Sequence, residues 1–350
     1  MARQTELRMA GPRIPVIDIS SLFAGPTPQR NEADRQIMAA ATSTGFMTVT
    51  GLPGDTLSPA VRRKLLSIFG LPGDSKRRLY RWNFDPSRPN VYRGWFPLTP
   101  GHPTWKEGID MGPDVAYGPD RADPQDPLTE ATPLPDPSEL PGWRDAACSY
   151  YRDMEQTGQV LMRAIARGLG LPETQFDAAF EQGISTLRLL HYPLRTPESL
   201  QGAGDETYVT HHGKPCYMLA RAHVDSGFVT LLAQDGVEGL QAQAADGAWL
   251  DVPPAEGTLA VNFGKLLARW TGGRVRATLH RVISSNRERY SIPFFFEPSV
   301  DTVISPLPLQ GAETFEPVSY GDHLWDATTK FVEQAGIAHL RSPRGIRLPG

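Results

Sequence analysis

Residues 221–241 read RAHVDSGFVTLLAQDGVEGLQ, and this stretch decides the fold. Its short apolar runs, divided by glycine and aspartate, predict a strand, a turn and a second strand. His223 and Asp225 lie two residues apart among aliphatic neighbours. Because side chains at i and i+2 of a strand point to the same face, we expect both polar groups to project together, with Val224 facing away.

From residue 185 onward, the chain continues as short apolar runs of the same kind, each the length of a short strand. Apolar runs divided by Gly, Pro, Asp and Asn recur in STLRLLHYP, GLQAQ, GAWLDVPP, GTLAVNFG, RVRATLHRVIS and RYSIPFFFEP. Many short strands at such spacing predict a β-sandwich or a jelly roll. We therefore expect a mainly β protein with helical additions.

The remaining segments predict a supporting α/β layer around this core. Strands are expected at 15–20 and 45–54, and helices at 35–43, 58–69, 142–168, 173–180 and 321–334. The chain divides by texture into an N-terminal α/β region (13–112), an irregular Pro-rich connection with supporting helices (113–184), the β-rich core (185–300) and a C-terminal extension with a helix (301–350).

Composition points to small, roughly neutral partners. The chain has 350 residues, a formal net charge of −4 and 21 % charged residues, so no basic face predicts binding to nucleic acid or to an anionic membrane. The start of the chain lacks the apolar run of a signal peptide, and no stretch approaches the roughly 20 apolar residues of a membrane helix. We expect a cytoplasmic protein in which Cys148 and Cys216 are free thiols. The oligomeric state is left open.

A third residue could join His223 and Asp225 around a metal ion. His280, in RATLHRVISS, is the best candidate because it lies on a later strand of the same β-rich region. Two histidines and one carboxylate on one face of a metal leave the opposite positions open, as in non-haem Fe(II) oxygenases. For a lone histidine, a hydrogen-bonded structural role would be the more common outcome.

Two further rows of side chains could face the same cavity. Arg289 and Ser291 share one face of the strand RYSIPFFFEP, and a guanidinium and a hydroxyl could converge there on one carboxylate. Arg188 and Tyr192 share a face of LRLLHYP, where they could present a cation and a phenol. A structural ion pair for Arg289 and a core position for Tyr192 are the alternatives.

At this point the sequence resembles the isopenicillin N synthase-like group of Fe(II)/2-oxoglutarate-dependent dioxygenases. The matching stretches are AHVDSGFVTLLAQDGVEGLQ, GAWLDVPPAEGTLAVNFGKLLARWTGG, ATLHRV and RERYSIPFFFEP. Weaker similarity is found in PVIDIS, GFMTVTGLPG, RGWFPL and WKEGIDMG. The resemblance implies a double-stranded β-helix, or jelly roll, with helices packed outside. It also implies oxidation of a small molecule, by hydroxylation or desaturation, with release of succinate and CO2, and a place in secondary metabolism.

The resemblance also assigns roles to residues. His223, Asp225 and His280 match the catalytic iron ligands, and Arg289 and Ser291 match the positions that bind the distal carboxylate of 2-oxoglutarate. Two single positions extend the assignment: Tyr192 as a further hydrogen-bond donor to 2-oxoglutarate, and Phe295 at a position that often faces substrate. The implied cofactors are Fe(II), 2-oxoglutarate and O2, with ascorbate as a reductant.

The substrate is the part least defined by the sequence. Arg188 and Arg93 could recognise an acidic or amino-acid-like substrate, or each could neutralise a nearby carboxylate. The segment 197–220 matches no part of the family pattern, and Gly264-Lys265 stands where relatives commonly have Gly-Asp. His211 and His212 are adjacent within that segment, so on an extended strand they would point to opposite faces, which favours a solvated or lid loop over a second metal site.

Two other functions remain open at this stage. Some relatives on this scaffold are iron oxidases that need no 2-oxoglutarate and use the Arg-x-Ser pair to hold the carboxylate of the substrate. A ligand-binding protein that kept the scaffold without turnover is the second alternative, although the intact set of candidate ligands argues against it.

Overall fold

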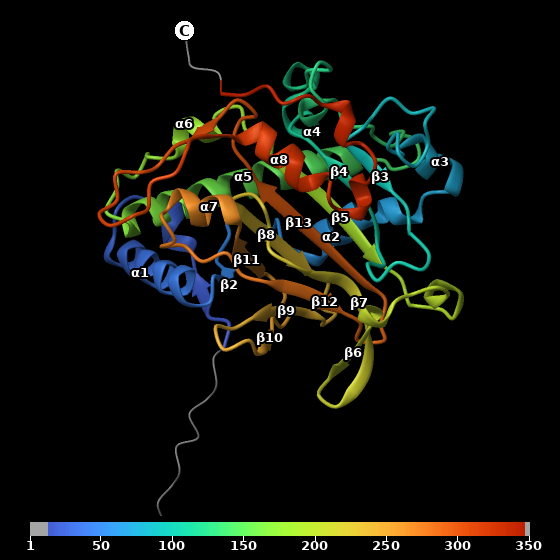
Figure 1. Cartoon of the computed structure of the whole chain (residues 1–350), viewed down its shortest axis with the longest axis horizontal. Helices are drawn as coiled ribbons and strands as arrows, with labels where there is room; N and C mark the ends of the chain where they lie inside the picture. Colours follow the sequence, from blue (N-terminus) through green and yellow to red (C-terminus); the bar gives the residue numbers. More distant parts are fainter. Residues whose placement is uncertain (1–12, 347–350) are drawn as a thin grey trace, which may run out of the picture.

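The computed structural model describes residues 13–346. The polar N-terminal tail, where we expected no signal peptide, lies outside these residues. Two sheets form a jelly roll (Figure 1). The larger sheet has eight strands in the order β1 (Val16–Asp18), β2 (Phe46–Thr50), β11 (Leu259–Phe263), β8 (Val229–Gln234), β13 (Arg289–Phe296), β5 (Thr186–Tyr192), β4 (Glu107–Met111) and β3 (Gly94–Phe96). The smaller sheet has five, in the order β10 (Trp249–Asp251), β9 (Leu240–Gln243), β12 (His280–Ile283), β7 (Lys214–His223) and β6 (Tyr208–His211).

The helices and one short strand pair surround these sheets. They are α1 (Pro28–Ser43), α2 (Pro59–Leu66), α3 (Gly73–Arg78), α4 (Asp114–Tyr117), α5 (Trp143–Gly168), α6 (Asp177–Phe180), α7 (Lys265–Trp270), α8 (Tyr320–Thr328) and the pair β14 (Val303–Ile304) and β15 (Val318–Ser319). Figure 1 shows the C-terminal segment, in red, on the side of the molecule that faces the viewer, with the β6–β7 hairpin projecting at the lower edge.

The long helix α5 supports the strand that carries Arg289 and Ser291. Its buried residues recur every three or four positions and pack against α1, α2, β8 and β13. Gly158 allows the closest approach, because a Cβ there would lie only 2.4 Å from the ring of Phe296 on β13. The helix ends where Gly170 adopts a φ of 73°, which lets the amide of Leu171 donate to the carbonyl of Ala166.

A second apolar cluster fills the space between the two sheets. It combines Phe46 and Leu190 from the larger sheet with Leu219, Ala242 and Val282 from the smaller sheet. This cluster packs the two sheets against each other.

The sequence predicted most elements but not all of their limits. The long helix was expected at 142–168 and begins at 143, whereas the helix expected at 321–334 ends at 328 and gives way to a separate turn. One local prediction was wrong: β7 ends at His223, so Asp225 lies in the loop before β8 and not on the strand. The two side chains converge because the chain turns there, not because of strand alternation.

The larger sheet joins strands from two of the four sequence ranges, 13–112 and 185–300. β11 of the β-rich core pairs with β2 of the N-terminal region, and β5 of the core pairs with β4. The four ranges proposed from the sequence therefore describe local sequence patterns. That each range forms a separate structural unit stays a prediction.

Candidate metal centre and cosubstrate site

Three possible metal ligands come together between β7 and β12. His223 ends β7 and His280 begins β12, and the two are directly opposite each other in the sheet register. Nε2 of His223 lies 3.5 Å, and Nε2 of His280 3.6 Å, from Oδ1 of Asp225. Ligand atoms that bind a divalent ion at about 2.1 Å and at right angles to one another are about 3 Å apart, so a small inward movement would close this group on an ion.

Backbone carbonyls orient both imidazole rings. Nδ1 of His223 lies 2.7 Å from the carbonyl oxygen of Arg221, and Nδ1 of His280 lies 3.1 Å from that of Thr278. In each ring Nδ1 therefore carries the proton and donates it, which leaves the lone pair of Nε2 available to a metal. In both histidines, a hydrogen bond to the carbonyl oxygen two residues earlier thus orients Nε2 for metal binding.

The second oxygen of Asp225 is held within the protein. Thr230 Oγ1 donates to Oδ2 at 2.6 Å and Asn262 Nδ2 donates to it at 2.7 Å, so Oδ1 is left to face the imidazoles. Burial alone would raise the pKa of Asp225, but His280, His223 and the Thr230 hydroxyl outweigh it and hold the pKa well below its usual range. Burial lowers the pKa of His280 to about 4, against the opposing effect of Asp225. Both groups are therefore in their metal-binding protonation states at neutral pH.

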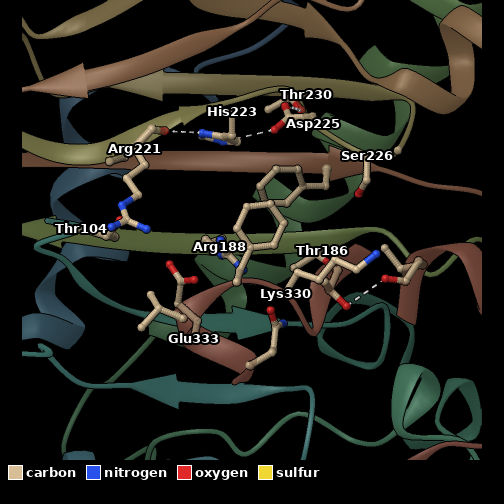
Figure 2. Close-up of a pocket in the computed structure, with 18 of the residues that line it drawn as sticks. Thr104, Thr186, Arg188, Arg221, His223, Asp225, Ser226, Thr230, Lys330 and Glu333 are labelled. Atoms are coloured by element: carbon tan, nitrogen blue, oxygen red, sulfur yellow. Dashed lines mark hydrogen bonds and ion pairs between the residues drawn. The ribbon is translucent and has the colours of Figure 1, made fainter. Parts of the chain in front are cut away.

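A cavity of about 490 Å³ opens beside this group. His223, Asp225, Arg188 and Phe295 line it, together with residues of the C-terminal segment. Figure 2 shows His223 and Asp225 on one side of the cavity, Arg188 at its back and Glu333 on the opposite side. A small molecule in this space would lie directly against His223 and Asp225, two of the three candidate ligands.

Arg289 and Ser291 form a buried set of donors, most of which have no acceptor among the described residues. Arg289 is 1 % exposed, and its Nη2 donates to Gln234 Oε1 at 3.1 Å. In the described part of the chain, Nε and Nη1 of Arg289 and Oγ of Ser291 have no hydrogen-bond partner. A buried guanidinium with free donors is costly unless an anion completes it, so these residues fit a bound carboxylate.

Tyr192 lies beside this donor set. It is directly opposite Arg289 in the register of β5 and β13, and the Arg289 guanidinium carbon lies 5.1 Å from the centre of its ring. The ring therefore contacts the cation through its face. The hydrogen bond expected from its hydroxyl to 2-oxoglutarate stays a prediction.

The three candidate substrate residues occupy different environments. Arg188 and Phe295 line the cavity, and Nε and Nη2 of Arg188 bind the Asp110 carboxylate, with the Nη2–Oδ2 distance 2.7 Å. Arg188 therefore neutralises a carboxylate, as the alternative from the sequence held, while it also faces the cavity.

Arg93 does not support the substrate role expected from the sequence. It is fully buried, does not belong to the cavity lining, and donates to Thr186 Oγ1 and to the carbonyl of Ile184. The reason is its location beneath the cavity wall, where the guanidinium joins loops to β5.

Sequence reasoning missed Glu297, a buried acid that also lines the cavity. Glu297 is 6 % exposed and its Oε2 has no partner among the described residues. Burial raises its pKa to about 7, although the Tyr320 hydroxyl and the Arg93 guanidinium act in the opposite direction. The polar residue directly after the apolar FFF run was the only signal for it in the sequence.

Sequence reasoning also missed the part of the C-terminal segment that lines the cavity, which lies within residues 324–335, because no local pattern marks it as part of a site. Phe331, 5.9 Å from the His223 ring between centroids, lies at the cavity, and the neighbouring Glu333 binds Lys106 at 2.8 Å. The pair is buried on both sides, with side-chain exposures of 12 % for Lys106 and 6 % for Glu333. This contact holds the segment across the cavity.

Two further expectations from the sequence concern the cysteines and membrane-spanning helices. Cys148 and Cys216 are free thiols, as expected. Within residues 13–346, the helices are all too short or too polar to cross a membrane.

Comparisons with known proteins agree with this geometry. The sequence model of the 2OG-Fe(II) oxygenase superfamily matches residues 187–298, and that of the non-haem dioxygenase in morphine synthesis N-terminal region matches residues 14–141. Isopenicillin N synthase of Streptomyces clavuligerus is 30 % identical over 325 residues, covering 90 % of this chain and 94 % of that protein. A 2-oxoglutarate-Fe(II) type oxidoreductase of Emericella nidulans is 31 % identical over 314 residues, covering 86 % and 84 %.

Solved structures show the same relationship. A full-length protein of Neurospora crassa, crystallised in complex with alpha-KG and thymine, superposes with a TM-score of 0.73 at 26 % identity, covering 89 % of this chain and 95 % of that one. The fold, the convergent ligand group and these matches together show that the chain belongs to the 2OG-Fe(II) oxygenase superfamily.

Proposed function

We propose that His223, Asp225 and His280 bind the Fe(II) of this oxygenase, and that Arg289 and Ser291 bind the distal carboxylate of 2-oxoglutarate. As a member of its superfamily, the protein is an oxidoreductase that uses Fe(II), 2-oxoglutarate and O2. The observation that carries the proposal is the convergence of Nε2, Oδ1 and Nε2 on one point beside the cavity. When bound, the iron and its cosubstrate supply the activation of dioxygen.

The chain's own residues orient and shield that chemistry. The carbonyls of Arg221 and Thr278 fix the rings of the two histidines, and Asn262 and Thr230 fix Asp225. The C-terminal segment covers the cavity and limits the access of water.

The substrate is proposed to be a small molecule with a hydrogen-bond acceptor, such as a carboxylate or a carbonyl. Support comes from Arg188, whose Nη1 has no hydrogen-bond partner in residues 13–346 while Asp110 holds the rest of the guanidinium in the cavity wall. Phe295 and Phe331 offer aromatic surface beside it. The Neurospora crassa complex with thymine, a ring that bears carbonyl groups, is consistent with this class.

An anaerobic titration tests the assignment of iron and 2-oxoglutarate. Adding Fe(II) and then 2-oxoglutarate to the metal-free protein should produce a weak visible charge-transfer band at one equivalent of each. His223→Ala should lose iron binding and the band while its far-UV and near-UV circular dichroism stay unchanged. Retained stoichiometric iron binding by this variant would show that His223 is not a ligand.

The same titration distinguishes the protein from an oxidase of the isopenicillin N synthase type, which the Streptomyces clavuligerus relative represents. That enzyme type would bind iron but give no band with 2-oxoglutarate and no succinate. Succinate formation under oxygen with a panel of small carboxylates and cyclic amides would in turn identify the substrate class.

A further inference from the structure

A second group of metal-binding side chains lies on the outer face of the smaller sheet. His211, His212 and Asp251 place one possible ligand atom each within 4.8 Å of one another. On β12, His280 points inward to the cavity, whereas the next residue, Arg281, points outward and donates to Gln241 Oε1 at 2.9 Å. Gln241 is directly opposite Asp251 in the register of β9 and β10, so Asp251 shares this outer face.

The β6–β7 hairpin brings both histidines to that face. His212 has a φ of 48° and Gly213 a φ of 73°, so the chain reverses in two residues with left-handed backbone. The reversal overturns the expectation from the sequence that adjacent histidines would point to opposite faces. Their rings instead lie 3.9 Å apart between centroids.

Both imidazoles point to the same carboxylate. Nε2 of His211 lies 3.2 Å from Oδ1 of Asp251, and Nε2 of His212 lies 3.3 Å from Oδ2. Two protonated imidazoles this close would repel each other, whereas one divalent ion could accept a lone pair from each ring. Imidazole with carboxylate is a ligand set that suits zinc and neighbouring transition metals.

We propose that His211, His212 and Asp251 form a binding site for a divalent transition-metal ion such as Zn²⁺, distinct from the iron site. The outermost strands of the smaller sheet are β10 and β6, yet the hairpin tip reaches Asp251. A bound ion would therefore tie the hairpin across the outer face of the sheet that carries His223 and His280. The site gives a role to a part of the segment 197–220, for which the sequence alone suggested none.

Gln241 is the positioning residue of this site. Its Nε2 lies 3.1 Å from Nδ1 of His211 and donates to Asp251 Oδ1 at 2.8 Å. When Nε2 of His211 binds an ion, the ring proton must reside on Nδ1, and rotation of the Gln241 amide presents an oxygen to it. The rotation breaks the hydrogen bond from Arg281 to Gln241 and the one from Gln241 to Asp251, which limits the affinity of the site.

The direct test is calorimetric titration of Zn²⁺ into metal-free protein that carries no affinity tag. The intact chain should bind two equivalents, because Zn²⁺ also fits the His223 site. His212→Asn, which tolerates the left-handed turn, and Asp251→Asn should each lose one equivalent or bind it at least tenfold more weakly. His339→Asn, which changes an exposed histidine elsewhere, should keep both.

His223→Ala separates this proposal from that of the iron site. In this background the remaining equivalent should raise the thermal midpoint, and the double variant His223→Ala/His212→Asn should show no such rise. A second equivalent that survives both His212→Asn and Asp251→Asn, or a single equivalent lost entirely in His223→Ala, would overturn the proposal. If His223→Ala leaves both equivalents in place, the iron assignment fails and this one stands.

Discussion

The free donors of Arg289 predict how strongly the protein depends on 2-oxoglutarate. Hydrogen bonds to a charged partner contribute about 1.5–3 kcal/mol, and Nε and Nη1 await such a partner. Arg289→Gln should therefore raise the dissociation constant of 2-oxoglutarate by at least about tenfold. The measurement is the anaerobic charge-transfer titration at fixed Fe(II).

Arg63→Gln is the matched control, because Arg63 is exposed on α2. It should leave the titration unchanged. Equal affinities in Arg289→Gln and the intact protein would mean that the cosubstrate binds elsewhere.

Glu297 predicts a pH dependence of stability. Its pKa is raised from 4.5 to about 7, so between these values the folded protein binds a proton that the unfolded chain does not. The free energy of unfolding must then fall as pH rises through this window, because the carboxyl group ionises in the unfolded chain while the buried group keeps its proton, and the fall ends once the buried group also ionises near pH 7. Glu297→Gln removes this dependence. The free energy of unfolding of the variant, minus that of the intact protein, should therefore be more positive at pH 8 than at pH 5, by up to a few kcal/mol.

Urea unfolding at the two pH values measures this effect. Glu313→Gln, at an exposed position, provides the control and should give the same difference at both. A pH-independent difference for Glu297→Gln would show that Glu297 is ionised throughout.

At the scale of elements, a buried ion pair joins Glu333 of the C-terminal segment to Lys106. Burial alone would raise the pKa of Glu333, but Lys106 and Arg188 lower it to about 2. A carboxyl group with a lowered pKa stabilises the fold above its ordinary pKa of 4.5, and this contribution is lost as pH falls toward 2. Glu333→Gln leaves Lys106 buried without its partner and should cost about 3–5 kcal/mol at pH 7.

Chemical denaturation, together with limited proteolysis of the segment, measures this loss. The double variant Lys106→Met/Glu333→Leu should recover much of the stability, because it removes both charges. If the double variant is no more stable than Glu333→Gln, the ion pair is not the contact that holds the segment.

The predictability of these elements follows from how local their determinants are. Arg289 and Ser291 could be placed together because strand alternation fixes two residues of one strand. His223 with Asp225 and His211 with His212 were misjudged in geometry, because each pair includes a residue outside regular strand. A turn can reverse the direction of a side chain, and the strand period does not describe it.

At the scale of the molecule, the order of strands could not be read from the sequence. The core strands β11 and β5 each pair with a strand far away in the chain, β2 and β4 respectively. The period of an apolar pattern says which face of a strand is buried but not which strand is its neighbour. For the same reason Lys106 and Glu333, more than two hundred residues apart, gave no signal.

This shared sheet predicts that the β-rich core does not fold alone. A fragment of residues 185–350 would lose β1 to β4 and α5, which would expose Leu259 and Val261 on β11 and the ring of Phe296. Both edges of the remaining sheet would also carry unpaired backbone groups. The fragment should therefore show no near-UV circular dichroism and no cooperative urea transition, whereas the whole chain should show both. Adding residues 13–184 as a separate chain should restore them, and a sharp transition of the fragment by itself would establish 185–350 as an independent domain.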